Sequence, residues 1–318
     1  MRKRRTFIAE SNTNVSVFTD DDFESNMDAF VRKLQAENKS KYTVTYYRRE
    51  LNKFMRTLES QGVTTRLRRL TAGIITDYYI NYSLNVKCVS YATVSAGLRA
   101  LRTFLNWAAS SGIIDKSPMG NIKIAAPKTA DIETFSREQL RELFRQPDLE
   151  TFVGFRDYAI MVLLLETGIR LRELVDLKTS DVRWADSQIA VAGKNGHARL
   201  VPYQPKTRRV LKQYINARGD SYVDHLFITH DDGQMSRKAV QDRIAKYGRM
   251  ANIKGVRCSP HTFRHTFAKM SVRNGADIFS LQKILGHSSL DMVRVYVNLF
   301  SGEVAEAHRK FSPIENLF

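Results

Sequence analysis

A histidine and an arginine at helical spacing are the side chains in this sequence best suited to chemistry on a phosphate. His261 and Arg264 lie three residues apart in the segment 259–265, which reads SPHTFRH, so both project from one face of a helix. An arginine fork binds phosphate oxygens in pairs, and an imidazole can add a hydrogen bond. The pair favours contact with a phosphodiester, although an HxxR spacing alone is a weak signal.

The same segment also permits a metal site. Cys258, His261 and His265 offer one sulfur and two nitrogens, and the two histidines share a helix face. Against zinc, the segment lacks the glutamate of the HExxH pattern, and Arg264 places a positive charge beside the metal position. No Walker or dinucleotide-binding glycine pattern is present. We therefore expect neither a metal nor a cofactor, and keep a zinc site as the lesser alternative.

Helices and one hairpin must position these groups. Asn195-Gly196 separates two apolar segments, which predicts a β-hairpin with strands over residues 188–192 and 198–202. A buried helix over residues 158–165 is expected to end at Gly168. A capping-box pattern, Ser136 followed by Gln139, predicts another helix start. Further helices are expected to begin near Thr207, Ser236, Pro260, Asp277 and Leu290.

The first third of the chain predicts four amphipathic helices. Apolar residues recur there at helical spacing, for example from Phe23 to Leu34 and from Val94 to Leu105. Candidate N-caps precede the helices, and glycines follow two of them. These signals are Asp20, Ser40, Thr71 and Ser90 at the starts, with Gly62 and Gly112 at the ends.

A change in composition divides the chain. Residues 117–133 contain Pro118, Gly120 and Pro127 and show little periodicity, which is typical of a linker. We expect a basic tail over residues 1–18, a helical domain over 19–116, and a second domain over 134–318. The predicted fold class is mainly α with a small β-hairpin or sheet insertion (α+β).

Positive charge is spread over both halves of the chain. The 318 residues carry a net charge of +17, with a pI near 9.9. Residues 1–125 hold 20 basic and 11 acidic side chains, so the charge is not confined to one end. Nucleic acid is the natural partner, because lysines and arginines bind phosphates and release counterions. A solvated basic surface that only promotes solubility is the alternative.

Several protein classes are excluded as leading interpretations. Two cysteines allow at most one disulfide, and no apolar segment approaches the length that spans a bilayer. The basic start, Met1 to Arg5, precedes only three apolar or small residues, too few for a signal peptide. We expect a cytoplasmic protein without a membrane partner.

Four motifs in the second half, in their order, resemble those of the tyrosine recombinase (phage integrase) family, in particular its Xer and integrase-like members. Residues 167–174 (TGIRLREL) resemble the first arginine motif, and residues 193–202 (GKNGHARLVP) the β-hairpin lysine motif. Residues 259–265 match the HxxRH motif and residues 285–289 (LGHSS) the next. Tyr296 follows His287 by nine residues, where the family has its nucleophile.

The resemblance implies a site-specific recombinase that joins DNA through a 3′-phosphotyrosine and a Holliday junction. It implies a four-helix core-binding domain, a catalytic domain with a subunit-docking tail, no metal and no ATP. The partners would be double-stranded DNA with specific sites, a homotetramer and accessory DNA-bending proteins, in a bacterial-type cytoplasm. The implied catalytic residues are Arg170, Lys194, His261, Arg264, His287 and the nucleophile Tyr296, supported by Glu173 and His265.

Two departures from the family motifs and several alternative functions stay open on the sequence alone. Arg172 stands where many members have a small residue, and Asn195-Gly196-His197 replaces a more usual hairpin tip. Lys194 could be an ordinary solvated lysine at that tip. A type IB topoisomerase would use the same chemistry, a non-enzymatic DNA-binding regulator would explain the charge, and a zinc nuclease would use Cys258.

Overall fold

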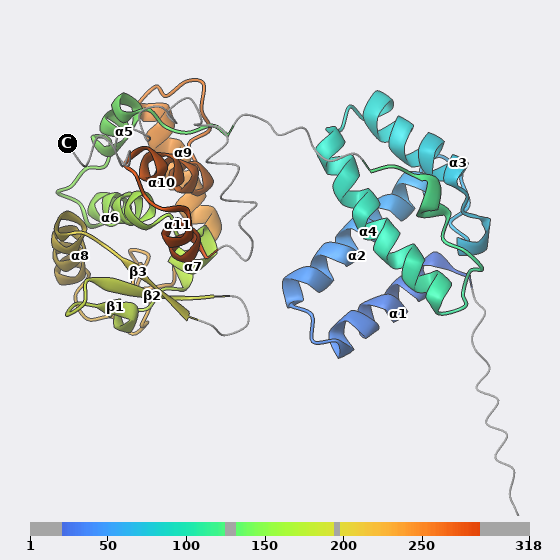
Figure 1. Ribbon diagram of the computed structural model, residues 1–318, viewed down its shortest axis with the longest axis horizontal. Coiled ribbons are helices and arrows are strands. Elements are labelled where there is room, and N and C mark those ends of the chain that lie inside the picture. The colour runs from blue at the N-terminus through green and yellow to red at the C-terminus, as the bar shows by residue number, and fades with distance from the viewer. Residues whose placement is uncertain (1–20, 125–131, 194–197, 287–318) are drawn as a thin grey trace, which may run out of the picture. The chain divides into compact units, whose positions relative to one another are not determined.

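The computed structural model describes residues 21–124, 132–193 and 198–286. The chain divides into two compact units, residues 1–130 and 131–318, and each is described by itself (Figure 1). The described residues are mostly helical, with one three-stranded sheet in the second unit. The expected fold class is confirmed. No helix among them is long and apolar enough to cross a membrane.

Side-chain caps start the long helices of the first unit. Ser40, Thr71 and Ser90 each accept a hydrogen bond from a backbone N–H three residues later, as predicted. At the first helix the prediction of Asp20 is wrong, because Asp22 is the N-cap. The elements are α1 (Phe23–Ala36), α2 (Lys41–Glu59), η1 (Leu67–Arg69), α3 (Ala72–Ile74), η2 (Ile75–Val86), α4 (Tyr91–Ser110) and η3 (Pro118–Asn121).

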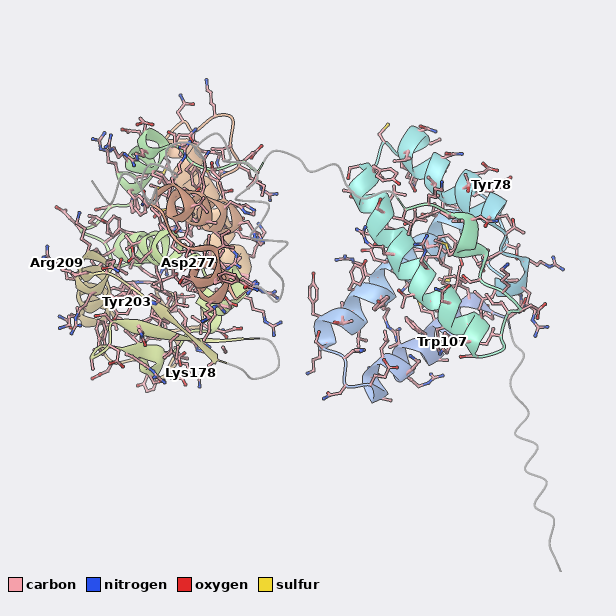
Figure 2. All side chains as sticks on the ribbon, in the orientation of Figure 1. Tyr78, Trp107, Lys178, Tyr203, Arg209 and Asp277 are labelled. Carbon is pink, nitrogen blue, oxygen red and sulfur yellow. The ribbon has the colours of Figure 1, made fainter. Side chains whose placement is uncertain are left out.

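Aromatic rings fill the centre of the first unit. The ring centroid of Phe104 on α4 lies 5.1 Å from that of Phe23 and 5.5 Å from that of Phe30. Trp107, labelled in Figure 2, extends the cluster at 5.3 Å from Phe30. Such tilted and edge contacts add to the burial of apolar area. The apolar stripes seen in the sequence therefore form one core.

The third helical segment departs from the predicted α-helix. It is α-helical only over Ala72–Ile74 and π-helical over Ile75–Val86. The apolar spacing predicts a helix but does not distinguish hydrogen bonding to the fourth residue from bonding to the fifth. Ile75, Tyr79 and Ser83 form its buried face.

The start of the expected linker is folded into the first unit. Residues 118–121 form the 3-10 turn η3, and Met119 and Ile122 are buried in the same core as the four helices. Arg102 of α4 also donates a hydrogen bond to the Ile122 carbonyl. The Pro and Gly residues there mark a turn, and the two apolar side chains hold that turn against the core.

In the second unit, the buried helix α6 packs against α8, α9 and α10, and the unit also contains a small sheet. Ser136 and Gln139 form the predicted capping box of α5, and α6 ends before Gly168 as predicted. The short α7 and β1 were not predicted, and the helix expected near Leu290 lies outside the described residues. The elements are α5 (Arg137–Phe144), α6 (Phe152–Thr167), α7 (Leu171–Asp176), η4 (Thr179–Asp181), β1 (Val182–Arg183), β2 (Gln188–Ala192), β3 (Ala198–Pro202), α8 (Pro205–Arg218), α9 (Arg237–Met250), α10 (Pro260–Arg273) and α11 (Ile278–Leu285).

The predicted hairpin strands have the predicted bounds. β2 pairs antiparallel with β3, with Ile189 opposite Val201 and Val191 opposite Arg199. Strand β1 adds to the other edge of β2, so the strand order is β1-β2-β3. Buried Ile189, Val191 and Val201 face the core of the unit, which fixes the register of the hairpin.

A buried carboxylate ties α6 to α9. Asp157, 2% exposed, accepts hydrogen bonds from Arg156, 4% exposed, at 3.1 and 2.8 Å. Its second oxygen accepts from Arg243 and from the Tyr247 hydroxyl, the latter at 2.8 Å. Burial and the nearby Asp157 charge raise the pKa of Tyr247 to about 12, so its hydroxyl stays a donor. The charges are paired within the core, as buried charges must be.

We expect Asp157→Asn to destabilise the second unit by about 3 kcal/mol, because two arginines lose their buried counter-charge. Each unit has one tryptophan, Trp107 and Trp184. In a Trp107→Phe background, urea unfolding followed by Trp184 fluorescence reports the second unit.

The matched control is Glu142→Gln, which breaks the exposed pair with Arg145 and should cost less than about 1 kcal/mol. Equal losses for the two variants would contradict a special role of the buried network.

Candidate active site

The turn after α6 presents Arg170. Helix α6 ends at Gly168, which adopts the left-handed conformation with φ 59°. A Cβ there would lie 2.4 Å from the Phe267 ring, so the backbone packs where a side chain could not fit. Arg170 then precedes α7, and its side chain is 40% exposed. The glycine turn thus brings an arginine to the surface directly beside the core.

Glu173 orients Arg170. Its carboxylate accepts from the Arg170 backbone N–H at 2.8 Å and from Arg170 Nη1 at 3.0 Å. The side chain of Glu173 is only 10% exposed. Burial raises its pKa, but hydrogen bonds from Arg199 and from the Arg170 backbone, with both arginine charges, outweigh this and lower it. Glu173 is therefore held as a carboxylate.

Arg199 of β3 is the residue that the sequence analysis missed. Its Nη1 and Nη2 atoms donate to the two Glu173 oxygens, each at 2.9 Å, and its side chain is 16% exposed. A signal was available in the strand pattern, because Arg199 shares a face with buried Val201 two residues later. A charge on the buried face of a strand requires a buried partner.

Arg264 is buried in α10, where Ser259 is the N-cap and Pro260 the first helical residue. The residue is 5% exposed. Its Nη1 donates to the Gly168 carbonyl at 2.5 Å and its Nη2 to the Leu285 carbonyl at 2.8 Å. Arg264 thereby connects the turn that precedes Arg170 with the end of α11.

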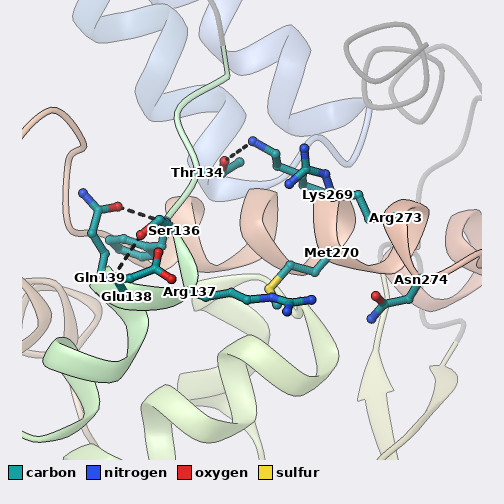
Figure 3. A pocket seen from close by; sticks show the side chains of 10 residues that line it. Thr134, Ser136, Arg137, Glu138, Gln139, Lys269, Met270, Arg273 and Asn274 are labelled. Carbon is teal, nitrogen blue, oxygen red and sulfur yellow. Dashed lines mark hydrogen bonds between the residues drawn. The ribbon is translucent and has the colours of Figure 1, made fainter. Parts of the chain in front are cut away.

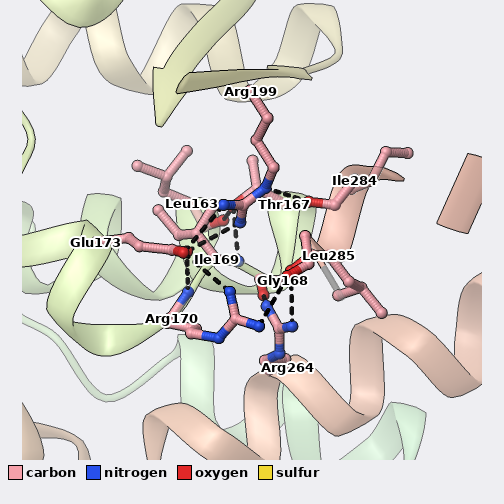
Figure 4. A network of polar contacts seen from close by, with 11 residues as sticks. Leu163, Thr167, Gly168, Ile169, Arg170, Glu173, Arg199, Arg264, Ile284 and Leu285 are labelled. Atoms are coloured by element: carbon pink, nitrogen blue, oxygen red, sulfur yellow. Dashed lines mark hydrogen bonds and ion pairs between the residues drawn. The ribbon is translucent and has the colours of Figure 1, made fainter. Parts of the chain in front are cut away.

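Three arginines meet at the C-terminal end of α11 (Figure 4). Arg199 Nε donates to the Ile284 carbonyl at 2.8 Å, Arg264 to that of Leu285, and Arg170 Nη2 to that of Gly286 at 3.0 Å. The last carbonyls of a helix have no partner within it and carry partial negative charge. Consecutive carbonyls thus hold arginines from three distant segments together.

His261 lies one helical turn from Arg264 and is exposed. Partial burial of its ring, followed by the charges of Arg264, Arg170 and Arg257, lowers its pKa. His265 is half-buried, with its ring 6.4 Å from that of His261, and burial lowers its pKa as well. Both imidazoles are thus favoured in the neutral form near pH 7.

The side chains considered for zinc are not assembled as ligands. No group of three or more histidine, cysteine, aspartate or glutamate side chains converges in the part of the chain that the structure describes. Cys258 instead packs against α9, where a Cβ on Gly248 would lie 2.3 Å from its sulfur. Burial raises the pKa of the Cys258 thiol, which opposes metal binding by the thiolate.

Three of the expected catalytic residues, Lys194, His287 and Tyr296, lie outside the described residues. Their neighbours in sequence are described: β2 and β3 flank residues 194–197, and Gly286, which follows α11, immediately precedes His287. The structure therefore brings together Arg170, Glu173 and Arg264 of the predicted set, with His261 on the same helix as Arg264.

A cavity of about 460 Å³ lies between the start of α5 and the second half of α10 (Figure 3). Thr134, Ser136, Lys269 and Arg273 are among its lining residues, and Lys269 donates to the Thr134 hydroxyl at 3.1 Å. Of the predicted catalytic residues that the structure describes, none lines it. Within the arginine cluster, Arg170 is the most exposed side chain, at 40%, whereas Arg199 and Arg264 are largely buried.

Two family models match the chain. One, described as the phage integrase family, matches residues 133–303, and the other, its N-terminal SAM-like domain, matches residues 27–112. Tyrosine recombinase XerC of Oceanobacillus iheyensis is 30% identical over 300 residues, 91% of this chain and 96% of the relative. Tyrosine recombinase XerD of Shewanella oneidensis is 29% identical, covering 90% and 96%.

Solved structures share the fold. The XerH site-specific recombinase bound to a palindromic difH substrate has a TM-score of 0.71 at 19% identity, covering 90% of this chain and 84% of that one. The Tn1549 transposon integrase in complex with transposon right end DNA has a TM-score of 0.72 at 19% identity, covering 89% and 98%. The resemblance inferred from the four motifs is confirmed. With a family model over more than half of its length and a 30% identical relative over nearly all of it, the chain belongs to the phage integrase family and is a site-specific tyrosine recombinase.

Proposed function

We propose that this recombinase cleaves DNA by attack of the Tyr296 hydroxyl on a phosphodiester. The new phosphorus–oxygen bond gives a 3′-phosphotyrosine, and the broken bond releases a 5′-hydroxyl. A 5′-hydroxyl of the partner duplex then displaces the tyrosine, and two such exchanges pass through a Holliday junction. The observation that carries the proposal is the convergence of Arg170 and Arg264 on adjacent carbonyls of one helix end.

The arginines supply charge that a metal ion would otherwise provide. Negative charge builds on the non-bridging oxygens as phosphorus becomes five-coordinate, and fixed positive groups stabilise that state. Arg170 is 40% exposed and accessible to a phosphate, whereas Arg264 contributes a buried guanidinium bound to the neighbouring carbonyl. Because carbonyls orient both side chains and Glu173 also binds Arg170, little reorganisation is needed during the reaction.

The histidines and the lysine handle protons. The lowered pKa of His261 favours a neutral imidazole, which can accept the proton of Tyr296 during attack. Lys194 donates a proton to the departing 5′-oxygen, and His287 hydrogen-bonds a non-bridging oxygen. His265 has a supporting role on α10, where its half-buried ring packs near that of His261. The phosphotyrosine conserves the energy of the broken bond, so the reaction uses no ATP and no cofactor.

Double-stranded DNA with specific recombination sites is the proposed partner. The net charge of +17 and its spread over both halves suit a protein whose two domains both contact phosphates. The XerH and Tn1549 relatives are described as bound to DNA. The helical unit serves as the core-binding domain, and four copies act on paired sites, together with accessory DNA-bending proteins.

The segment after Tyr296 is the proposed connector between subunits. Its apolar side chains, Phe311, Ile314, Leu317 and Phe318, need a surface to cover them. A head-to-tail contact of this kind closes into a ring, which suits a tetramer on two duplexes.

Tyr296→Phe is expected to bind DNA normally and to form no covalent adduct, because only the nucleophilic hydroxyl is lost. The substrate is a duplex selected from a randomised library by the full chain and then nicked to trap the intermediate. A denaturing gel detects the adduct.

The wild-type protein should form this adduct in excess EDTA without nucleotide. A requirement for a divalent ion would favour the zinc nuclease, and an adduct with Tyr296→Phe would refute the nucleophile. Product joined to a second duplex, rather than only resealed, separates recombination from topoisomerase activity.

Lys194→Ala is expected to slow cleavage through the leaving group. A substrate with sulfur at the 5′-bridging position leaves without protonation, so it should restore most of the rate. The same sulfur should not rescue Arg170→Ala, whose defect lies in the charge on the non-bridging oxygens. Equal rescue in single-turnover assays would exclude Lys194 as the general acid.

Truncation after Leu299 is expected to weaken cooperative assembly while leaving binding to one site nearly intact. Mobility shifts on duplexes with one and two sites measure the two properties. A second, full-length variant with Ser at the four apolar tail positions should behave like the truncation. It shows whether the apolar side chains, rather than the length of the tail, are responsible. Unchanged cooperativity and recombination would exclude the tail as the connector.

A further inference from the structure

Arg199 contacts two parts of the active site at the same time. Its Nη1 and Nη2 atoms bind both oxygens of Glu173, while its Nε binds the Ile284 carbonyl at the end of α11. These partners are 26 and 85 residues away in sequence. A planar guanidinium has the geometry for both contacts at once, which an ammonium group lacks.

The backbone is shaped to admit this side chain. Gly286 adopts the left-handed conformation with φ 63°, and a Cβ there would lie 2.9 Å from Arg199 Cζ. Gly286 also offers its carbonyl to Arg170 at 3.0 Å. The guanidinium of Arg199 therefore packs directly against the residue that precedes His287 in sequence.

Arg199 sets how strongly Glu173 holds Arg170. Glu173 is 10% exposed and needs positive charge, and Arg199 pairs with both of its oxygens. The Arg170 side chain donates a hydrogen bond to only one of the two Glu173 oxygens, through Nη1. Without Arg199, the buried carboxylate would depend on Arg170 alone, and would draw that side chain away from the exposed position where a phosphate can meet it.

We propose that Arg199 is a positioning residue for strand cleavage, acting through Glu173 and the α11 carbonyl end to keep Arg170 extended toward the scissile phosphate. The inference rests on the proposed function, because the phosphate is the ligand that Arg170 awaits. It assigns the effect of Arg199 to the charge on the non-bridging oxygens and not to Lys194, although the two residues are only five apart in sequence.

The test compares Arg199→Ala and Arg199→Lys with the wild type on the selected nicked duplex, at saturating protein and in a single turnover. Arg199→Ala should cleave about 100-fold more slowly, as expected for a misplaced catalytic group. Arg199→Lys restores charge without the fork and should be intermediate. Duplex affinity should change little in either variant.

Arg208→Ala is the matched control, because Arg208 is also an arginine near the sheet but donates to Ser187 at 3.0 Å. It should cleave like the wild type. Thermal unfolding of every variant identifies any that fail to fold, and Arg199→Lys keeps the test valid if Arg199→Ala is one of them.

Two readouts separate positioning from a merely structural role. In a double-mutant cycle, Glu173→Gln should remove most of the additional effect of Arg199→Ala, because the two act as one unit. Loss of Arg199 also removes the largest contribution that lowers the Glu173 pKa. Cleavage by Arg199→Ala should therefore fall from about pH 8 to about pH 5.5 more steeply than wild-type cleavage, as the carboxylate becomes protonated.

Three results would overturn the inference: additive effects of Arg199→Ala and Glu173→Gln, a parallel pH profile, or rescue of Arg199→Ala by the 5′-bridging sulfur. The last would show that Arg199 acts through Lys194. Failure of the wild type to form an adduct in the same gel would instead refute the proposed function, so the two failures are distinguishable.

Discussion

The arginine cluster, the candidate active site, depends on the need of a helix end for hydrogen-bond donors. The carbonyls of Ile284, Leu285 and Gly286 close α11, and arginines from β3, α10 and the turn after α6 satisfy them. Three guanidinium groups so close together would repel one another in isolation. The partial negative charge of the helix end and the carboxylate of Glu173 offset that repulsion, so the three cationic groups can lie side by side.

Glycines allow this gathering by occupying positions where a side chain would collide. Gly168 packs against the side chains of Phe267 and Leu285, and Gly286 packs against that of Arg199. Both glycines have a positive φ, which glycine adopts without strain. Each glycine also supplies a carbonyl that accepts from an arginine, Arg264 in the first case and Arg170 in the second. The two motifs that contain these glycines are therefore parts of one structural unit, although more than 110 residues separate them.

Local signals made much of the fold predictable, and long-range contacts did not. Caps such as Ser40, Thr71 and Ser90 act within a few residues, and so does the Asn-Gly pattern in the sequence between the two strands. Helix starts and hairpin strands could therefore be predicted directly. The motifs singled out Arg170, Glu173 and Arg264, which the structure brings together. The strand alternation places Arg199 on a buried face but does not identify Glu173 as its partner. The π-helical hydrogen bonding after Ile74 and the Asp157 network depend on packing between distant segments, for which single-sequence periodicity contains no signal.

The turn η3 determines where this chain can be divided for study. Met119 and Ile122 complete the core of the helical unit, so a fragment that stops at residue 116 would expose an apolar surface and lose the Arg102 contact. A fragment that extends through residue 124 keeps both. The complementary fragment from residue 131 retains every described arginine of the cluster, so that nuclear magnetic resonance or crystallisation of the isolated catalytic half becomes a practical route to its phosphate-bound form.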